Sequence, residues 1–531
     1  MLLSLIQSLN PRFCSERGRP GSASSPGRAT RIVSSWPAAF LAGFLVFLLV
    51  PRASWGQSAA NVELEPSEQL FCVLAALNAA GYDTGLGSNA SDNTRLAVRD
   101  FLAKRHAAVV PNLEKFYAQH HVEGDPGADL GPYVSLALLL GPPPDFKFTV
   151  PEAELPPDVR DLKAFVPLLR AFYDQGVLLD LWQRVQPQYD AAVARYTEAV
   201  RRSFMLTEAY FRFPAGGYLG RKYNIYIDLL GAPEQAQARI YGLNYYLVVT
   251  PSKEPKLDEI RHQYMHFLFD PLAAKYTAEI EQKAMLAGIA HQAPMLSLDF
   301  KEDFPLLVTE CLIRAAELRL DKQPAAQAEK SLTEMTAGGL VLVRYFYDAL
   351  AAFEKQEASM TIYYKQMVMG INPVEEEKRL LAITFTPRPK PQAGKPVPAG
   401  SEEDRLLDQA DNLFFQKKYP EAKAAYQGVL EKTDPKSERA LYGLAVVYSA
   451  TLKPDLADEY FQKTLDVAHD LRIVTWSHIY LGRLYDLRGK RDDALAQYHA
   501  AALTASAYPL ALRAVESGLA QAFGSEEDGK K

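Results

Sequence analysis

The chain has 531 residues, of which 48% are apolar and 23% charged, and its formal net charge is −6. These proportions are those of an ordinary globular protein, and the length allows several domains, each with a core of its own. The slightly acidic balance and the lack of a dense Lys/Arg run argue against a nucleic-acid partner.

The first 56 residues have the pattern of an export signal. A basic leader is followed by an apolar stretch at 38–50 and by Ser54-Trp55-Gly56, a small-x-small pattern typical of a cleavage site. The apolar stretch is shorter than the about 20 residues that a membrane-spanning helix needs. We therefore expect residues 1–56 to be a signal peptide with a basic leader, and the protein to be periplasmic or secreted. A membrane anchor that stays uncleaved is the alternative.

The cysteine count excludes a disulfide-dense scaffold, because the chain has only three. Cys14 would leave with the signal peptide. Cys72 and Cys311 could form one disulfide in an oxidising compartment, but the sequence does not determine whether they pair.

Helical periodicity dominates the chain from residue 65 to about 213, including a long region at 159–211 in which Pro187 predicts a break. The composition then changes. The segments 222–230 and 238–250 are rich in Tyr, Ile and Val and predict two strands. Helices resume and continue to about residue 379. The sequence therefore predicts a mainly α (α+β) fold with a small tyrosine-rich sheet.

Two histidines one helical turn apart follow these strands. His262 and His266 lie at i and i+4 in a segment that we expect to be helical from about Leu257, so both imidazoles project from one face and can bind one metal ion. Asp270-Pro271 is expected to end this helix. The spacing is that of the zinc-protease motif H-E-x-x-H. The alternative is a helix whose two half-buried histidines only pack.

A third ligand is expected from a later helix, and Glu310 is the best candidate. Its alternative role is an exposed ion pair with Arg314 at i+4, although its apolar neighbours indicate a buried helix. Glu317 lies near the same face and is the weaker candidate. The remaining histidines of interest, His120, His121 and His291, are expected to be surface or packing residues.

With these residues the chain resembles the gluzincin type of metallopeptidase, in which a downstream helix supplies a glutamate. More narrowly, it resembles a family of bacterial gluzincin-like domains with a helical N-terminal half, tyrosine-rich strands, H-E-x-x-H before an apolar run with proline, and a later glutamate followed by Arg-Ala. The residues that match this pattern are His262, His266, Pro271, Glu310, Arg314 and Ala315. The resemblance implies a helical zincin-like domain over 57–385, with zinc bound by the two histidines and the glutamate.

Gln263 departs from that pattern, because it stands where the family has its general-base glutamate. Glutamine is nearly isosteric and can hydrogen-bond a water molecule, but it cannot accept the proton of that water. The loss of a general base costs typically about 10²–10⁴-fold in rate. Glu259, one turn earlier, is a candidate surrogate base or an outer-shell partner of a ligand histidine. The sequence thus predicts metal binding without efficient hydrolysis.

A proline-rich linker at 386–401 precedes an internal repeat. In the repeat, Ala422 is followed by Ala457 and Ala494 at intervals of 35 and 37 residues, each with an aromatic four residues later. These intervals are close to the about 34 residues of tetratricopeptide helix pairs. We expect residues 402–524 to form three such repeats and a capping helix, followed by a polar tail at 525–531.

Three functions are compatible with this pattern. The first is an exported zinc-binding, metallopeptidase-like protein that is catalytically weakened or inactive, with tetratricopeptide repeats that bind a protein or peptide partner. The second is an active zinc metallopeptidase that uses another base. The third is a helical scaffold in which the histidines only pack and no metal is bound.

Overall fold

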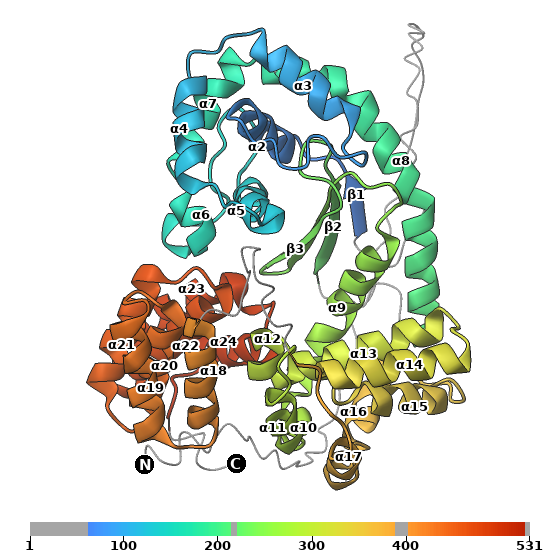
Figure 1. Cartoon of the computed structure of the whole chain (residues 1–531), viewed down its shortest axis with the longest axis vertical. Helices are drawn as coiled ribbons and strands as arrows, with labels where there is room; N and C mark the ends of the chain where they lie inside the picture. The colour runs from blue at the N-terminus through green and yellow to red at the C-terminus, as the bar shows by residue number, and fades with distance from the viewer. Residues whose placement is uncertain (1–61, 214–219, 388–401, 526–531) are drawn as a thin grey trace, which may run out of the picture.

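A small β-sheet lies within an arch of helices in the computed structural model, which describes residues 62–213, 220–387 and 402–525 (Figure 1). The described residues form 23 α-helices, one 3₁₀-helix and four strands. The protein is therefore mainly α with a small sheet, as the sequence predicts. The expected signal peptide, most of the linker and most of the polar tail lie outside the described residues. None of the described helices is long and apolar enough to cross a membrane.

The first helices of the chain form the arch and part of its interior (Figure 1). They are α2 (Glu68–Ala79), α3 (Asn93–Ala103), α4 (Val110–His120), α5 (Pro126–Leu138), η1 (Glu152–Glu154), α6 (Pro157–Asp161), α7 (Phe165–Gln175) and α8 (Leu178–Phe211). The predicted break at Pro187 is wrong, since α8 runs through it for 34 residues. On either side of the proline, Trp182 and Tyr189 pack edge-on against each other and both contact Phe71 of α2. This packing outweighs the backbone hydrogen bond that proline removes.

The sheet consists of β1 (Val62–Glu65), β2 (Lys222–Ile227), β3 (Ala236–Tyr241) and β4 (Asn244–Val249), in the order β1-β2-β4-β3. The strands β1, β2 and β4 are parallel, whereas β3 is antiparallel to β4. The single strand predicted at 238–250 is thus a hairpin. Its two-residue turn has Gly242 at φ 58°, a backbone conformation that glycine adopts without strain.

The helices after the sheet carry the histidine motif and the core that surrounds it. They are α9 (Leu257–Lys275), α10 (Thr277–Glu281), α11 (Met285–His291), α12 (Leu298–Glu302), α13 (Phe304–Leu320), α14 (Ala325–Gly338), α15 (Val343–Phe353), α16 (Met360–Met369) and α17 (Pro373–Leu380). The prediction that α9 ends at Asp270-Pro271 is wrong. Pro271 cannot donate to the carbonyl of Phe267 one turn earlier, and Arg221 donates to that oxygen instead, which allows α9 to continue.

The C-terminal helical region, residues 402–520, forms three consecutive helix pairs and a last helix. Its members are α18 (Glu402–Phe415), α19 (Tyr419–Lys432), α20 (Glu438–Ala450), α21 (Pro454–Val467), α22 (Leu471–Leu487), α23 (Arg491–Ala505) and α24 (Pro509–Ala520). The alanines of the periodic pattern are buried. Neighbouring helices approach closely at glycines, both between pairs and within one: a Cβ on Gly443 would lie 2.4 Å from Cζ of Tyr426, and one on Gly482 would lie 2.7 Å from Cε1 of Tyr498.

Candidate metal centre

The helix α9 is oriented by aromatic residues on the face opposite its histidines. Tyr264 stacks on Phe204 of α8 with ring centroids 3.7 Å apart, and Phe267 packs edge-on against Tyr245 of the sheet. The hydroxyl of Tyr223 donates to the carbonyl of Ile260. Because this face is buried against the sheet and α8, His262 and His266 project from the other side of α9, toward α13.

The facing stripe on α13 is charged, although the helix is otherwise among the most buried in the protein. Glu310, Arg314 and Glu317 lie at i, i+4 and i+7 and therefore on one side of the helix. Asp303 caps the start of α13 by accepting a hydrogen bond from the backbone of Leu306. The apolar positions fix α13 in the core, so the charged stripe is held against the histidine pair.

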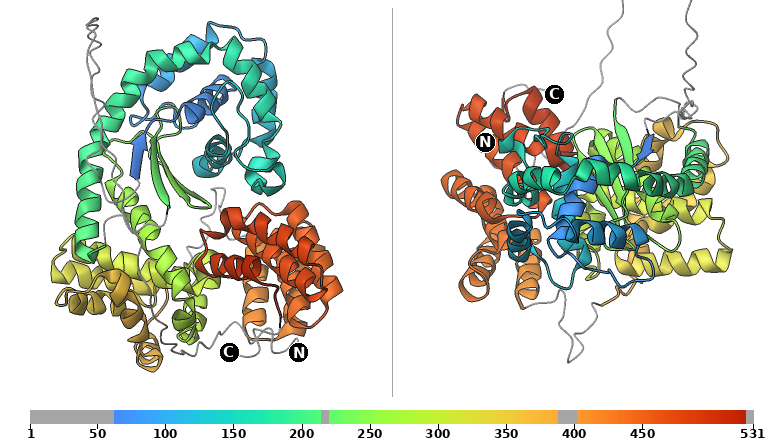
Figure 2. Two further views of the ribbon diagram at one scale, coloured as in Figure 1. Left: turned by 180° about the vertical axis from the view of Figure 1, so that it is seen from behind. Right: turned by 90° about the horizontal axis from the view of Figure 1, so that it is seen from above.

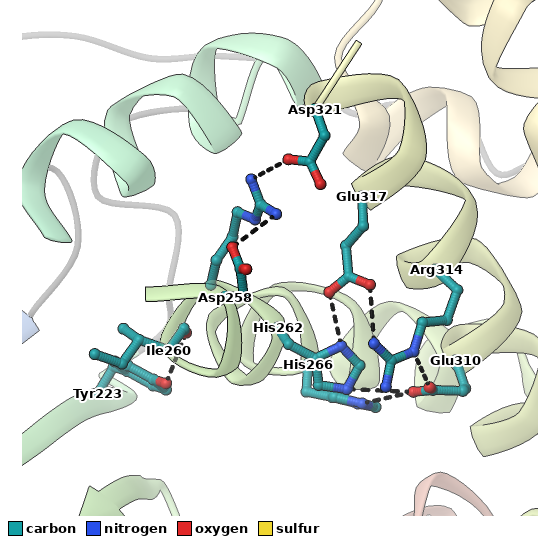
Figure 3. A network of polar contacts seen from close by, with 10 residues as sticks. Tyr223, Asp258, Ile260, His262, His266, Glu310, Arg314, Glu317 and Asp321 are labelled. Atoms are coloured by element: carbon teal, nitrogen blue, oxygen red, sulfur yellow. Dashed lines mark hydrogen bonds and ion pairs between the residues drawn. The ribbon is translucent and has the colours of Figure 1, made fainter. Parts of the chain in front are cut away.

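The two histidines converge on one carboxylate oxygen (Figure 3). Nε2 of His266 lies 3.3 Å from Oε2 of Glu310, and Nε2 of His262 lies 3.4 Å from the same oxygen. The three side chains form a group whose ligand atoms all lie within 4.8 Å of one another and which could hold a metal ion. The structure therefore brings together His262, His266 and Glu310, hereafter the ligand triad.

The other nitrogen of each ring is bonded to a second carboxylate. Nδ1 of His262 lies 3.0 Å from Oε1 of Glu317, and Nδ1 of His266 lies 3.0 Å from Oδ1 of Asp270. Histidine ligands of metals usually donate their second ring N–H in this way, which fixes the tautomer and aims the free nitrogen at the metal. Glu317 is thus an outer partner of His262 rather than an alternative ligand, and Asp270 has the same role for His266.

Arg314 bridges the two glutamates of α13. Its Nε donates to Oε1 of Glu310 over 2.7 Å, and its Nη1 donates to Oε2 of Glu317 over 3.0 Å. The intrahelical ion pair that the sequence offered as an alternative role for Glu310 is therefore present. This ion pair uses Oε1 of Glu310, while Oε2 faces the histidines, so Glu310 can pair with Arg314 and face the two rings at the same time.

Strong electrostatic coupling follows from the burial of these groups. Burial alone lowers the pKa of His266, but the carboxylates of Asp270 and Glu310 outweigh it and raise that pKa to about 10. Burial alone raises the pKa of Glu310, but His262 and His266 hold it well below its ordinary value. The pKa of Glu317 is lowered against burial by His262 and Arg314. The cluster thus favours the ionised forms of Glu310 and Glu317 and the protonated form of His266 when no cation is bound.

The donor set fits a divalent cation. The carboxyl groups of Asp270, Glu310 and Glu317 outnumber the single guanidinium of Arg314, so the surroundings of the two rings favour an added positive charge. Two imidazole nitrogens and a carboxylate oxygen are ligands that zinc accepts at about 2.0–2.1 Å. In a tetrahedral site with such bonds, neighbouring ligand atoms lie about 3.3 Å apart. The two nitrogen–oxygen separations seen here are close to that value.

Gln263 is half-buried on α9, between the two histidines in sequence. Glu259 does not join the cluster. Its carboxylate lies 3.3 Å from Nζ of Lys256, and its side chain is 48% exposed. The two carboxylates that do contact the ligand triad from outside, Glu317 and Asp270, are each bonded to a ring nitrogen.

His120, His121 and His291 and the two described cysteines lie outside the cluster. His120 stacks on Phe116, His121 bonds Asp129, and His291 stacks on Phe415. Cys72 and Cys311 are both buried and free, so the disulfide that the sequence allowed is not formed. Burial raises the pKa of both thiols, which keeps them protonated.

The main functional residue that sequence reasoning missed is Asp270, which was interpreted only as part of a helix end. Its spacing was the available signal: it lies at i+4 from His266, where a helical neighbour can reach the Nδ1 atom. Glu317 was named from the sequence as the weaker ligand candidate, and the structure shows it at Nδ1 of His262 instead.

Comparison of the chain with protein-family models, with curated proteins and with solved structures gives no significant match.

Proposed function

We propose that the protein is an exported, zinc-binding, metallopeptidase-like protein whose hydrolytic chemistry is weakened or lost. The observation that carries this proposal is the convergence of both Nε2 atoms on one oxygen of Glu310, with each Nδ1 atom bonded to a further carboxylate. Burying a carboxylate costs free energy. A pair of histidines that only pack would therefore not need the carboxylates of Glu317 and Asp270 at their Nδ1 atoms.

Zinc is the metal best suited to two imidazoles and one carboxylate, and in such a site it polarises a carbonyl and lowers the pKa of a bound water. His262, His266 and Glu310 would bind the ion, while Glu317 and Asp270 would hold the rings in the tautomer that ligates. Arg314 would neutralise the second oxygen of Glu310. These roles need only the side-chain contacts already present.

The weakened chemistry follows from Gln263. Its amide can orient a water molecule by hydrogen bonding but cannot take up a proton from it. An active peptidase with Glu259 as the base is disfavoured, because the carboxylate of Glu259 is paired with Lys256 and exposed. The signal-like residues 1–56 support export, and the repeat pattern of 402–524 supports a role in binding protein.

Elemental analysis of the purified full-length protein tests the metal function. We expect one zinc per chain in the wild type and none after the double substitution His262→Ala and His266→Ala. His120→Ala is the matched control, since this histidine stacks on Phe116 outside the triad and should leave the zinc content unchanged. Equal zinc in the wild type and the double variant would reject the proposal and favour the metal-free scaffold.

A further inference from the structure

The C-terminal helical region packs directly on the segment that leads into α13 (Figures 1 and 2). The ring of Phe415, at the end of α18, stacks on His291 of α11 with centroids 5.0 Å apart and an interplanar angle of 10°. The helix α12 lies next along the chain and meets α22. The region is therefore attached by specific side-chain contacts, in addition to the covalent linker.

Arg472 makes one of these contacts through a buried side chain. Its side chain is 1% exposed at the start of α22, where it hydrogen-bonds Glu302 and lies 3.3 Å from Oδ1 of Asp299, both on α12. A buried guanidinium is costly unless it is paired. Two of the acidic partners of Arg472 lie on α12. Loss of this contact would therefore leave the guanidinium on α22 and the carboxylates on α12 without their partners, which is unfavourable.

Arg472 lies on α22, the first helix of the third pair, and Phe415 lies on α18, the first helix of the first pair, so both contacts come from first helices. Burial raises the pKa of Tyr442 on α20 well above its ordinary value, and the charge of nearby Glu302 raises it further. Glu302 has the same effect on Tyr480 of α22. Helix-pair repeats bind partners along a surface shared by successive repeats. Here part of that surface is in contact with the chain's own residues 298–302.

These contacts continue to both helices of the ligand triad. Asp303, 1% exposed, accepts from Leu306 at the start of α13 and from the backbone N–H of Leu510 at the start of α24. The helix α24 also packs against α9 and α13. The carboxylate of Asp303 thus links the start of α13, two turns before Glu310, to the C-terminal region.

We propose that the C-terminal helical region is an intramolecular clamp, which binds residues 298–303 of its own chain through Arg472 and thereby sets the metal affinity of the ligand triad. This inference rests on the proposed metal function. A clamp that holds α9 and α13 together keeps the histidines and Glu310 at ligating distance, so the docked state binds metal more tightly than the released state. By reciprocity, bound metal stabilises the docked state. A protein that took over the surface around Arg472 would displace α12 and weaken metal binding.

The experiment combines two measurements on the full-length protein: hydrogen exchange at the Leu510 amide and zinc affinity by competition with a chromophoric chelator. The Leu510 amide lies in the first turn of α24 and has no acceptor within its own helix, so its protection depends on Asp303. We expect Arg472→Met to speed its exchange and to weaken zinc binding by about tenfold, a typical coupling between sites. We also expect zinc to slow this exchange in the wild type.

Two further variants make the result specific. Arg472→Met combined with Glu302→Met removes this ion pair as a unit and leaves Asp299 and Asp470 partly exposed to solvent; such a replacement is often tolerated and should restore protection and zinc affinity. Arg488→Met is the control, because Arg488 pairs with Asp455 and Asp458 within the C-terminal region itself, and both readouts should stay at wild-type values.

Three outcomes would overturn the clamp. One is rapid Leu510 exchange in Arg472→Met with unchanged zinc affinity, which would separate docking from the metal site. The second is unchanged exchange in that variant, which would mean that Arg472 does not hold the clamp. The third is a wild type that binds no zinc, which would reject the metal function as well. If the wild type binds zinc and Arg472→Met changes neither readout, the clamp is rejected while the metal function stands.

Discussion

His266 donates its Nδ1 hydrogen to Asp270, one turn later on the same helix and over 3.0 Å. This relationship determines which nitrogen of His266 faces Glu310. It also depends on a helix that continues through Pro271, because Asp270 would otherwise not stay at helical spacing. The helix α9 therefore carries both a histidine of the ligand triad and the carboxylate that orients it.

The substitution Asp270→Asn tests that support. Asparagine keeps the shape of the side chain but can hydrogen-bond His266 in either sense, so the ring is no longer fixed in one tautomer. We expect zinc affinity to fall about 10–100-fold, as for other outer partners of metal ligands. Chelator competition measures it. Asp258→Asn, on the exposed part of α9 near Arg261, is the control and should have no effect.

Zinc binding should release protons and strengthen as the pH rises. The pKa of His266 without metal is raised to about 10, so at pH 7 the ring must lose a proton before it can ligate. Calorimetry in buffers of different ionisation enthalpy should find at least one proton released per zinc at pH 7. Binding that is independent of pH between 6 and 9 would contradict the coupling.

The same pKa gives a stability prediction for chelator-treated protein. The pKa of His266 is higher in the folded state than in the unfolded state, where it is about 6.5. The ion pair of His266 therefore stabilises the fold fully below about pH 6.5. This contribution is lost as the pH rises toward 10. Urea unfolding of chelated protein should give a lower free energy at pH 10 than at pH 7, and His266→Gln should reduce that difference.

Gln263→Glu tests the interpretation of the weakened chemistry. If the glutamine is the defect, a glutamate in its place should increase peptidase activity by about 10²–10⁴-fold over the wild type. A panel of fluorogenic peptides measures the gain. The gain should vanish when His266→Ala is added, because the reaction needs the metal. Wild-type activity that disappears in Glu259→Ala would instead identify Glu259 as the base.

The contact between Arg221 and Phe267 predicts a stability effect away from the ligands. Arg221→Met removes the donor to a carbonyl that Pro271 cannot satisfy, and we expect a loss of about 1–3 kcal/mol in the free energy of unfolding. Adding Pro271→Ala supplies a helical N–H to the same carbonyl and should recover part of the loss. If the double variant is no more stable than Arg221→Met alone, this explanation of the long helix is wrong.

The aromatic–glycine contacts of the C-terminal helical region predict opposite effects at two helical glycines. Gly443→Ala would bring a methyl group against the ring of Tyr426 and should cost about 1–3 kcal/mol of stability. Gly428→Ala, in α19 with no atom within 4 Å of the new Cβ, should stabilise by about 0.5–1 kcal/mol. Thermal unfolding of the two variants measures both.

The sequence predicted what depends on local pattern and missed what depends on tertiary contacts. The i, i+4 spacing of His262 and His266 predicted a shared face, and the apolar flanks of Glu310 predicted its burial. The breaks expected at Pro187 and Pro271 did not occur, because Trp182 and Tyr189 pack around one proline and Arg221 satisfies the carbonyl left by the other. The docking of Arg472 on Glu302, 170 residues earlier, has no local signal.

The most direct test of the central claim is the zinc K-edge X-ray absorption spectrum of the metal-loaded, full-length protein. We predict a first shell of nitrogen and oxygen at about 2.0–2.1 Å with multiple scattering from two imidazoles, and loss of one oxygen neighbour or of the metal itself in Glu310→Ala. A shell with sulfur at about 2.3 Å, or a spectrum unchanged by His262→Ala and His266→Ala, would contradict the assignment of the ligand triad.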